Sequence, residues 1–319
     1  MDFKNKINMN FRIVLIAVFF NCAVASAQKV TNVEGSKYIF KEVIRHDASP
    51  VESQGRTGTC WSFSALSFLE SEIMRVNKTD KPVVLSEMFI VRKAYEAKAK
   101  KFIRMDGRTN FGEGGAFHDI PYVIKNFGIV PQNVYTGLQK KSDSYNHGDM
   151  FKDLNRIVGD ARSQGKGIQQ SWVDEYNATL DENIGELPET FKYKGEKYTA
   201  ITFYNSLGID MNDYVSITSF TNHPMYEKCM LQIPDNWLWE ESYNVSVDEM
   251  YAATLSALKS GYTVAWGADV SEEGFSFSNG LAVVPLEKDK VIVEGEDNSN
   301  FSDAGADKKA TIFTQPDSE

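Results

Sequence analysis

Cysteine is scarce in this 319-residue chain, which has only three. So few thiols exclude a disulfide-built scaffold and a four-cysteine zinc site. Positive charge is also in deficit, because 34 lysines and arginines stand against 44 aspartates and glutamates, for a formal net charge of −10. This balance argues against a nucleic-acid-binding protein, since contacts with phosphates need a basic face. Only four histidines are present, which leaves few candidates for a general base.

The chain does have the composition of a globular protein. Hydrophobic residues make up 42% of it and charged residues 24%, which excludes wholesale disorder and collagen-like or low-complexity fibres. The length allows one large domain or two modest ones, and either can bury a hydrophobic core.

Residues 1–27 have the features of a secretory signal. Cations precede a short apolar run, Ile13–Phe20, and the small residues at Ala25–Ala27 form a cleavage site before Gln28. The apolar run is too short to span a bilayer comfortably. An uncleaved anchor or the start of a buried helix is the alternative, and a lipoprotein signal at Cys22 lacks the small residues expected before it. We therefore predict a periplasmic or secreted protein, without membrane attachment after cleavage, whose single domain spans 28–319.

Hydrophobic periodicity predicts several helices and strands. Helical spacing and capping signals indicate helices over 61–77, from 86 to about 102 with a basic outer face, over 120–126 and over 246–260. In the first of these, Leu66, Leu69, Ile73 and Val76 share one face. Apolar stretches indicate strands over 198–204, 214–220, 262–270, 281–285 and 291–293. Residues 140–200 are polar, with one amphipathic stretch at 172–183, and are interpreted as an insertion within the domain.

One segment concentrates the chemistry: Gln54-Gly-Arg-Thr-Gly-Thr-Cys60-Trp61-Ser62-Phe63. A glycine-rich turn delivers a cysteine to the first turn of a predicted helix. The positive end of the helix dipole favours a thiolate, and free N–H groups there can donate to the oxyanion formed when a carbonyl is attacked. The side-chain amide of Gln54 can complete such an oxyanion hole. The alternative is a small, buried cysteine at a helix start.

This segment resembles the active-site segment of papain-like cysteine peptidases, and more narrowly that of the bleomycin hydrolase/aminopeptidase C branch. The resemblance runs from about residue 51 to residue 285, and the Cys60 segment is its most specific part. Further segments are similar to that branch in the same order: Leu85-Ser86-Glu87, Gly112-x-Gly114-Gly115, Gly128-Ile129-Val130-Pro131, Ile201-Thr202-Phe203-Tyr204, Asp213-Tyr214-Val215 and Gly261–Val270.

The resemblance implies an α+β, papain-like fold with a helical subdomain facing an incomplete β-barrel-like one. It implies Cys60 as the nucleophile, Gln54 as an oxyanion-hole donor and Trp61 packed beside the site. Gly114 and Gly115 would hold a substrate peptide by backbone hydrogen bonds; a simple turn is the alternative, and a phosphate cradle would lack the Lys-Ser/Thr of a P-loop. The resemblance also implies peptide substrates, no metal or organic cofactor, and a ring-like homo-oligomer, a hexamer in that branch.

The histidines depart from the family pattern. A thiol peptidase needs a general base, and an Asn or Asp to orient it. In the branch these lie in a His-x-Met-like strand and an Asn-Ser-Trp-Gly-like segment, neither of which occurs in this sequence. The four histidines stand in other contexts, with His118 the least implausible substitute: His46, His118, His147 and His223. We therefore predict that this chain is a truncated representative of an active, aminopeptidase-like enzyme.

Two other interpretations remain open. A catalytically inactive peptide-binding module would keep the cleft, lack the base, and bind peptides without turnover. A transglutaminase-like acyl transferase would use the same thiol and would incorporate amines. Cys229 is predicted to be a half-buried core thiol; a disulfide between Cys229 and Cys60, which would block the nucleophile, is the alternative.

Overall fold

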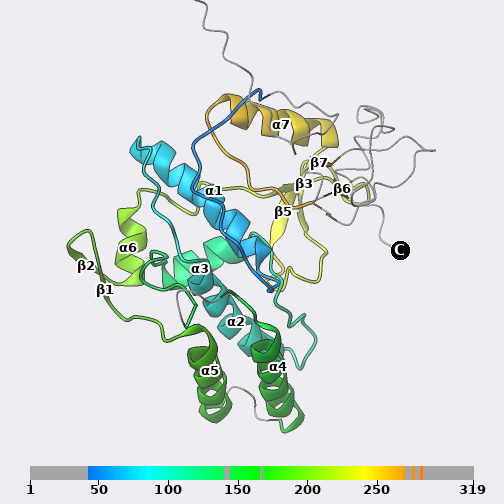
Figure 1. The fold of residues 1–319 in the computed structure, drawn as a ribbon. Helices are drawn as coiled ribbons and strands as arrows, with labels where there is room; N and C mark the ends of the chain where they lie inside the picture. Colours follow the sequence, from blue (N-terminus) through cyan, green and yellow to red (C-terminus); the bar gives the residue numbers. More distant parts are fainter. Residues whose placement is uncertain are drawn as a thin grey trace, which may run out of the picture.

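The computed structural model describes residues 42–139, 144–165, 167, 169–268, 270, 275–276 and 281–282. They form an α+β fold in which a helical half lies beside a half that contains most of the short strands (Figure 1). None of the described helices is long and apolar enough to cross a membrane. The segment interpreted as a signal and the strand predicted at 291–293 lie outside the described residues.

Two long helices form the centre of the helical half. α1 spans Cys60–Asn77 and α2 spans Glu87–Arg104, as predicted to within a few residues. Ser86 begins α2 by accepting a hydrogen bond from the Phe89 N–H at 3.1 Å, which satisfies one of the free donors of the first turn. α1 ends at Lys78, whose φ of 50° lies in the left-handed region.

The predicted apolar face of α1 is correct except at its last turn. Leu66, Leu69 and Ile73 are at most 3% exposed, whereas Val76 is 41% exposed. The error arises in the last turn of the helix, where residues 75–78 are all exposed.

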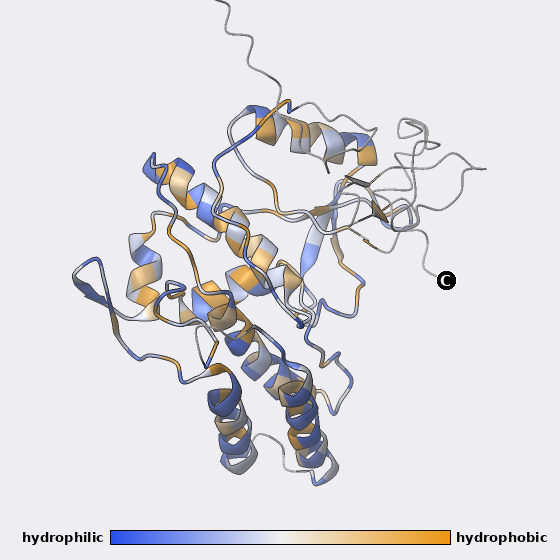
Figure 2. Cartoon of the chain, viewed as in Figure 1, coloured by the Kyte–Doolittle hydropathy of each residue, from blue (hydrophilic) through white to orange (hydrophobic). Residues whose placement is uncertain are grey.

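α3 spans Asp119–Phe127 and packs against both α1 and α2. Gly128 ends α3 as predicted, with a φ of 78°, and a β-carbon there would collide with the backbone of Ala200. Figure 2 shows hydrophobic residues gathered where α1, α2 and α3 face one another, and hydrophilic residues on the outer faces of the helices. This contiguous core fixes the start of α1, where the candidate nucleophile lies.

The polar stretch at 140–200 contains more regular structure than the sequence pattern predicts. α4 spans Gly148–Ser163 and α5 spans Gln170–Ile184, and the two helices pack against each other and against α2. Only α5 was expected, from the amphipathic stretch at 172–183. In α4 the high average polarity masks an apolar stripe at helical spacing, formed by Met150, Leu154 and Ile157, all of which are buried.

The strand predicted at 198–204 is wrong over most of its length. β1 (Phe191–Tyr193) and β2 (Glu196–Tyr198) form a short antiparallel hairpin, and the chain then enters α6, which spans Ala200–Ser206. Thr199 and Thr202 make a reciprocal capping box at the start of α6. This cap outweighs the strand propensity of a segment rich in threonine and aromatic residues.

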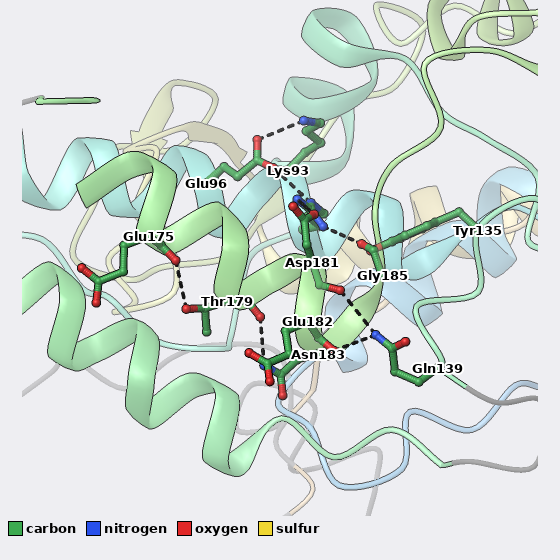
Figure 3. Close-up of polar contacts among 11 residues, drawn as sticks. Lys93, Glu96, Tyr135, Gln139, Glu175, Thr179, Asp181, Glu182, Asn183 and Gly185 are labelled. Atoms are coloured by element: carbon green, nitrogen blue, oxygen red, sulfur yellow. Dashed lines mark hydrogen bonds and ion pairs between the residues drawn. The ribbon is translucent and has the colours of Figure 1, made fainter. Parts of the chain in front are cut away.

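A buried arginine joins α5 to α2, and Figure 3 shows its partners. The guanidinium of Arg92, on α2, donates to the Gly185 carbonyl at 2.6 Å and to Asp181 Oδ1 at 2.6 Å. It also pairs with Glu96 on its own helix at 3.2 Å, and its side chain is only 6% exposed. The hydroxyl of Tyr135 donates to the same Gly185 carbonyl at 3.3 Å. The free carbonyl at the C-terminal end of α5 is thereby satisfied by side chains from elsewhere in the helical half.

We expect Arg92→Ala to lower the free energy of unfolding by about 2–4 kcal/mol, because it leaves buried acceptors without their charged donor. Lys93→Ala is the matched control. It removes the neighbouring ion pair with Glu96, which is 3.0 Å long and more exposed, and should change stability by about 0.5 kcal/mol. Urea unfolding followed by circular dichroism measures both. Equal losses in the two variants would contradict an anchoring role for Arg92.

The other half is built on a small sheet with the strand order β3-β5-β4. β3 (Ile217–Thr218) pairs in parallel with β5 (Glu241–Asn244), and β4 (Lys228–Met230) pairs antiparallel with the other edge of β5. β6 (Phe275–Ser276) and β7 (Leu281–Ala282) form a separate antiparallel pair. The strand predicted at 214–220 is therefore reduced to two residues, while the described part of the one predicted at 281–285 is a strand.

The helix predicted at 246–260 is confirmed as α7, which spans Val247–Lys259. Ser246 and Glu249 form a capping box at its start. Its apolar residues are only half-buried within the described structure: Met250, Leu255 and Leu258.

The strand predicted at 262–270 is wrong for the part that the structure describes. Residues 262–268 are irregular and belong to none of the described sheets. Tyr262, Val264 and Trp266 alternate along the chain and are 43%, 41% and 62% exposed. An alternating pattern becomes a strand when a neighbouring strand supplies hydrogen bonds and cross-strand contacts, and none of the described strands lies in a sheet with this segment.

Candidate active site

Cys60 is the first residue of α1 and is exposed. The hydrogen bonds of the first turn begin with the Ser62 N–H, which donates to the Thr59 carbonyl at 2.9 Å. In the described part of the chain, the N–H groups of Cys60 and Trp61 have no acceptor. An accessible thiol and free donors thus share the positive end of a long helix, an arrangement suited to attack on a carbonyl and to stabilisation of the resulting oxyanion.

Gln54 lies on the same loop as Cys60 and holds that loop in shape. Its side-chain Nε2 donates to the Thr57 carbonyl at 2.5 Å, and the Thr57 hydroxyl donates back to the Gln54 carbonyl at 2.9 Å. A carboxamide nitrogen carries two hydrogens, so one N–H of Gln54 remains for an oxyanion. The structure brings the two predicted catalytic residues onto one closed loop.

A segment far away in the sequence supports this loop. The Arg56 N–H donates to the Tyr145 carbonyl at 2.8 Å, and the His147 N–H donates to the Arg56 carbonyl at 3.3 Å. Gly55, at a φ of 60°, lies so close to Tyr145 that a β-carbon would collide with its carbonyl oxygen. Sequence reasoning missed this support, because nothing local links residues 54–56 to the polar stretch that contains Tyr145.

Glu113 connects the Cys60 loop to the predicted Gly-Gly loop. Its carboxylate accepts a hydrogen bond from the Gly58 N–H at 2.7 Å, and its backbone carbonyl accepts one from Trp61 Nε1 at 3.1 Å. Trp61 is 4% exposed, and its indole N–H joins the start of α1 to the Gly-Gly loop. Sequence reasoning also missed Glu113, whose position between Gly112 and Gly114 was the only signal available.

Both glycines of the Gly-Gly loop lie in close contact with other side chains. A β-carbon on Gly115 would stand 2.8 Å from the Trp61 ring and 2.7 Å from Asp119 Oδ2, and one on Gly114 would overlap the Asp235 carboxylate. The contacts of Gly115 with the buried Trp61 ring and Asp119 require glycine at that position, whereas at Gly114 the Asp235 side chain would have to move. The loop is therefore packed against the residue that follows Cys60.

The histidines lie in other surroundings. His46 Nε2 is 2.7 Å from the Leu258 carbonyl oxygen. The ring of His118 is largely buried, and this burial lowers its pKa. Burial also lowers the pKa of His147 to about 4. Among the described residues no hydrogen bond joins Cys60 to His46, His118, His147 or His223.

The described cysteines are both free thiols. Cys229 is 6% exposed on β4, which confirms a core thiol more deeply buried than predicted, and it forms no disulfide with Cys60. Within the described ranges no group of three or more His, Cys, Asp or Glu side chains is arranged to hold a metal ion.

Comparison with known proteins places these features in context. The profile of the Peptidase C1-like family matches residues 87–294, a span that begins after Cys60. Aminopeptidase C from Lactococcus lactis subsp. lactis is 25% identical over 260 residues, covering 70% of this chain and 59% of that protein. Bleomycin hydrolase from Mus musculus is 22% identical over 292 residues, covering 75% and 63% respectively.

The fold has a similar solved structure, that of PepW from Lactobacillus rhamnosis HN001. The TM-score is 0.60 and the sequence identity 19%, over 72% of this chain and 61% of PepW. This likeness establishes the papain-like α+β fold. The chain spans about three fifths of the length of the relatives that it matches.

Proposed function

Because this chain belongs to the Peptidase C1-like family, we propose that it is a thiol peptidase that hydrolyses peptide bonds, with Cys60 as its nucleophile. Its similarity to proteins named aminopeptidase C, G and E supports action on the N-terminal residue of a peptide. The observation that carries the proposal is the exposed Cys60 at the start of α1, on a closed loop that also holds Gln54.

In the proposed reaction, the Cys60 thiolate attacks the carbonyl carbon of the scissile bond. The oxyanion accepts hydrogen bonds from the Cys60 N–H and the Gln54 carboxamide. The tetrahedral species then expels the amine, which takes up a proton, and leaves a thioester on Cys60. Water attacks this thioester, releasing the carboxylic acid and restoring the thiol. We propose that the general base comes from outside the described residues.

Peptide substrates would lie along the Gly-Gly loop. The N–H groups of Gly114 and Gly115 have no acceptor among the described residues, and they are available to the backbone of a bound peptide.

We also propose that the protein is exported and assembles as a ring-like homo-oligomer. N-terminal sequencing of protein collected outside the cytoplasm should start at Gln28, and light scattering should give the mass of an oligomer.

The test of the proposed function uses aminoacyl and peptidyl fluorogenic amides with the purified chain under reducing conditions. We expect release of the fluorophore from substrates with a free N-terminus. A peptidyl chloromethyl ketone should alkylate Cys60 faster than iodoacetamide does, because the peptide portion binds beside the thiol. No turnover together with no preference for the peptidyl reagent would refute the proposal.

One observation favours a second candidate, an inactive peptide-binding module. None of the four histidines is hydrogen-bonded to Cys60 within the described structure. This candidate predicts preferential labelling by the peptidyl reagent and saturable peptide binding, with no release of the fluorophore. Turnover at any rate above that of a Cys60-blocked sample would exclude it.

A further inference from the structure

Lys98 is a buried cation behind the Gly-Gly loop. It lies in the middle of α2 and is only 2% exposed. Its ammonium donates to the backbone carbonyls of Gly114 and of Gly112, the latter at 3.3 Å. No carboxylate of the described residues forms an ion pair with it. Burying a lysine ammonium costs free energy, and here two carbonyls of one loop are its hydrogen-bond acceptors. Such a cost indicates that the arrangement of this loop matters.

Three aromatic rings surround the Lys98 ammonium. The ring centres of Trp61, Tyr95 and Trp237 lie 5.4, 5.8 and 6.0 Å from its nitrogen. Distances of about 6 Å or less are within the range of cation–π attraction. The Lys98 ammonium is thus held in place by the rings as well as by the carbonyls, and one of the rings belongs to the residue next to Cys60.

More distant carboxylates offset the Lys98 charge. Asp119 and Asp235 act on the ammonium in the direction that raises its pKa, against the larger effect of burial, which lowers it. Asp119 Oδ2 accepts a hydrogen bond from Trp237 Nε1 at 2.6 Å, and burial raises the pKa of this carboxyl to about 7. The side chains of Asp119, Asp235 and Trp61 lie against the glycines of the Gly-Gly loop. Together with Lys98 they form the wall on which this loop rests.

The contacts fix the direction of three successive peptide groups. The carbonyls of Gly112 and Gly114 point to Lys98, and the carbonyl of Glu113 points to the Trp61 indole. All described peptide bonds are trans, and in a trans peptide the C=O and N–H bonds point in opposite directions. The N–H groups of Gly114 and Gly115 must therefore point away from this wall.

We propose that Lys98 is a positioning residue for substrate: by holding the Gly114 carbonyl inward, it presents the N–H on the opposite side of the same peptide group, that of Gly115, to the backbone of a bound peptide. The inference rests on the proposed function, because it requires a peptide to bind on this loop. Lys98 itself touches neither the thiol nor the substrate. Its loss would weaken peptide recognition and leave the intrinsic reactivity of Cys60 unchanged.

The experiment compares two alkylation rates at Cys60, with a peptidyl chloromethyl ketone and with iodoacetamide, in the full chain. Lys98→Met keeps the length of the side chain and removes the charge and the donors. We expect the peptidyl rate to fall about tenfold, and the iodoacetamide rate to stay within about twofold. Lys98→Arg, which keeps charge and donors, should recover part of the peptidyl rate. Lys100→Met, on the same helix without these contacts, should behave as wild type.

The outcomes separate this inference from the proposed function. A wild type without preference for the peptidyl reagent refutes the proposed function. A wild type with that preference, which Lys98→Met retains, overturns the role of Lys98. Parallel loss of both rates in Lys98→Met also overturns it, because this would mean general damage to the site. Should Lys98→Met fail to fold, Lys98→Gln provides the same comparison, since its shorter, neutral amide cannot reach both carbonyls.

Discussion

Replacement of Cys60 with serine should abolish covalent labelling by thiol reagents at the active site and lower peptide hydrolysis by at least about a thousandfold. The thiol lies at the start of α1, three residues after the turn that Gln54 and Thr57 close. Serine preserves the size and the helix start, but its hydroxyl is scarcely ionised without a base beside it. Mass spectrometry of the alkylated protein and fluorogenic assays measure the two effects.

Cys229→Ser is the matched control. Cys229 is 6% exposed, and burial raises the pKa of its thiol, so it should react slowly and contribute nothing to hydrolysis. We expect the Cys229→Ser variant to keep wild-type labelling and activity. If Cys229→Ser lost activity while Cys60→Ser retained it, Cys229 would be the nucleophile. The proposed function would then lose its basis.

The helices were predictable where their ends are determined by local chemistry. Ser86 and Ser246 both cap the helices predicted to start beside them, and Gly128 ends α3. A cap acts within one turn of the chain, so a short stretch of sequence contains all the information. The start of α1 lacks such a cap, and Cys60 could be placed there because a glycine-rich turn precedes the apolar helical spacing.

The supports of the site were not predictable, because they join segments that are far apart in the sequence. Tyr145 holds the backbone at Gly55, and Glu113 holds the N–H of Gly58. The helix from 86 to about 102 was predicted to have a basic outer face, which is the ordinary place for a lysine, yet its Lys98 is nearly inaccessible. A lysine gives no local signal of burial, since its partners here are carbonyls and rings contributed by other elements.

The strand predicted at 262–270 failed for a related reason. Alternation of apolar residues indicates which side chains share a face, but strand formation depends on a partner. In the described structure Tyr262 and Trp266 are 43% and 62% exposed, and neither lies in a strand. The sequence pattern therefore identified which side chains alternate along this segment. It could not show whether a neighbouring strand is present to form a sheet with it.

The second large effect is expected from pH. Glu87, the first residue of α2, is 3% exposed, and burial raises the pKa of its carboxyl to about 8 from an ordinary value of 4.5. Between these two values the folded protein binds a proton that the unfolded chain does not, so stability should fall as pH rises through this window. The loss is at most about 5 kcal/mol, since one pKa unit corresponds to about 1.4 kcal/mol. Urea unfolding at pH 5, 7 and 9 measures it.

The groups around Glu87 explain the direction. One carboxylate oxygen of Glu87 is buried without a hydrogen-bond partner among the described residues. Glu70, on α1, and Glu52 add repulsion that also favours the protonated form. The position at a helix N-terminus favours the ionised form by about 0.3–1 kcal/mol. This is smaller than the cost of burying an unpaired charge, so burial decides the outcome.

Glu87→Gln should match wild type near pH 5 and exceed its stability by about 2–5 kcal/mol at pH 9, because an amide mimics the protonated acid and never ionises. Some loss with rising pH should persist in this variant, since burial also raises the pKa of Asp119 to about 7. The exposed Glu186→Gln should follow wild type at every pH. If Glu87→Gln and wild type lost stability in parallel from pH 5 to pH 9, Glu87 would already be ionised in the folded protein. The N–H groups and the helix dipole at the start of α2 would then have to stabilise the Glu87 carboxylate.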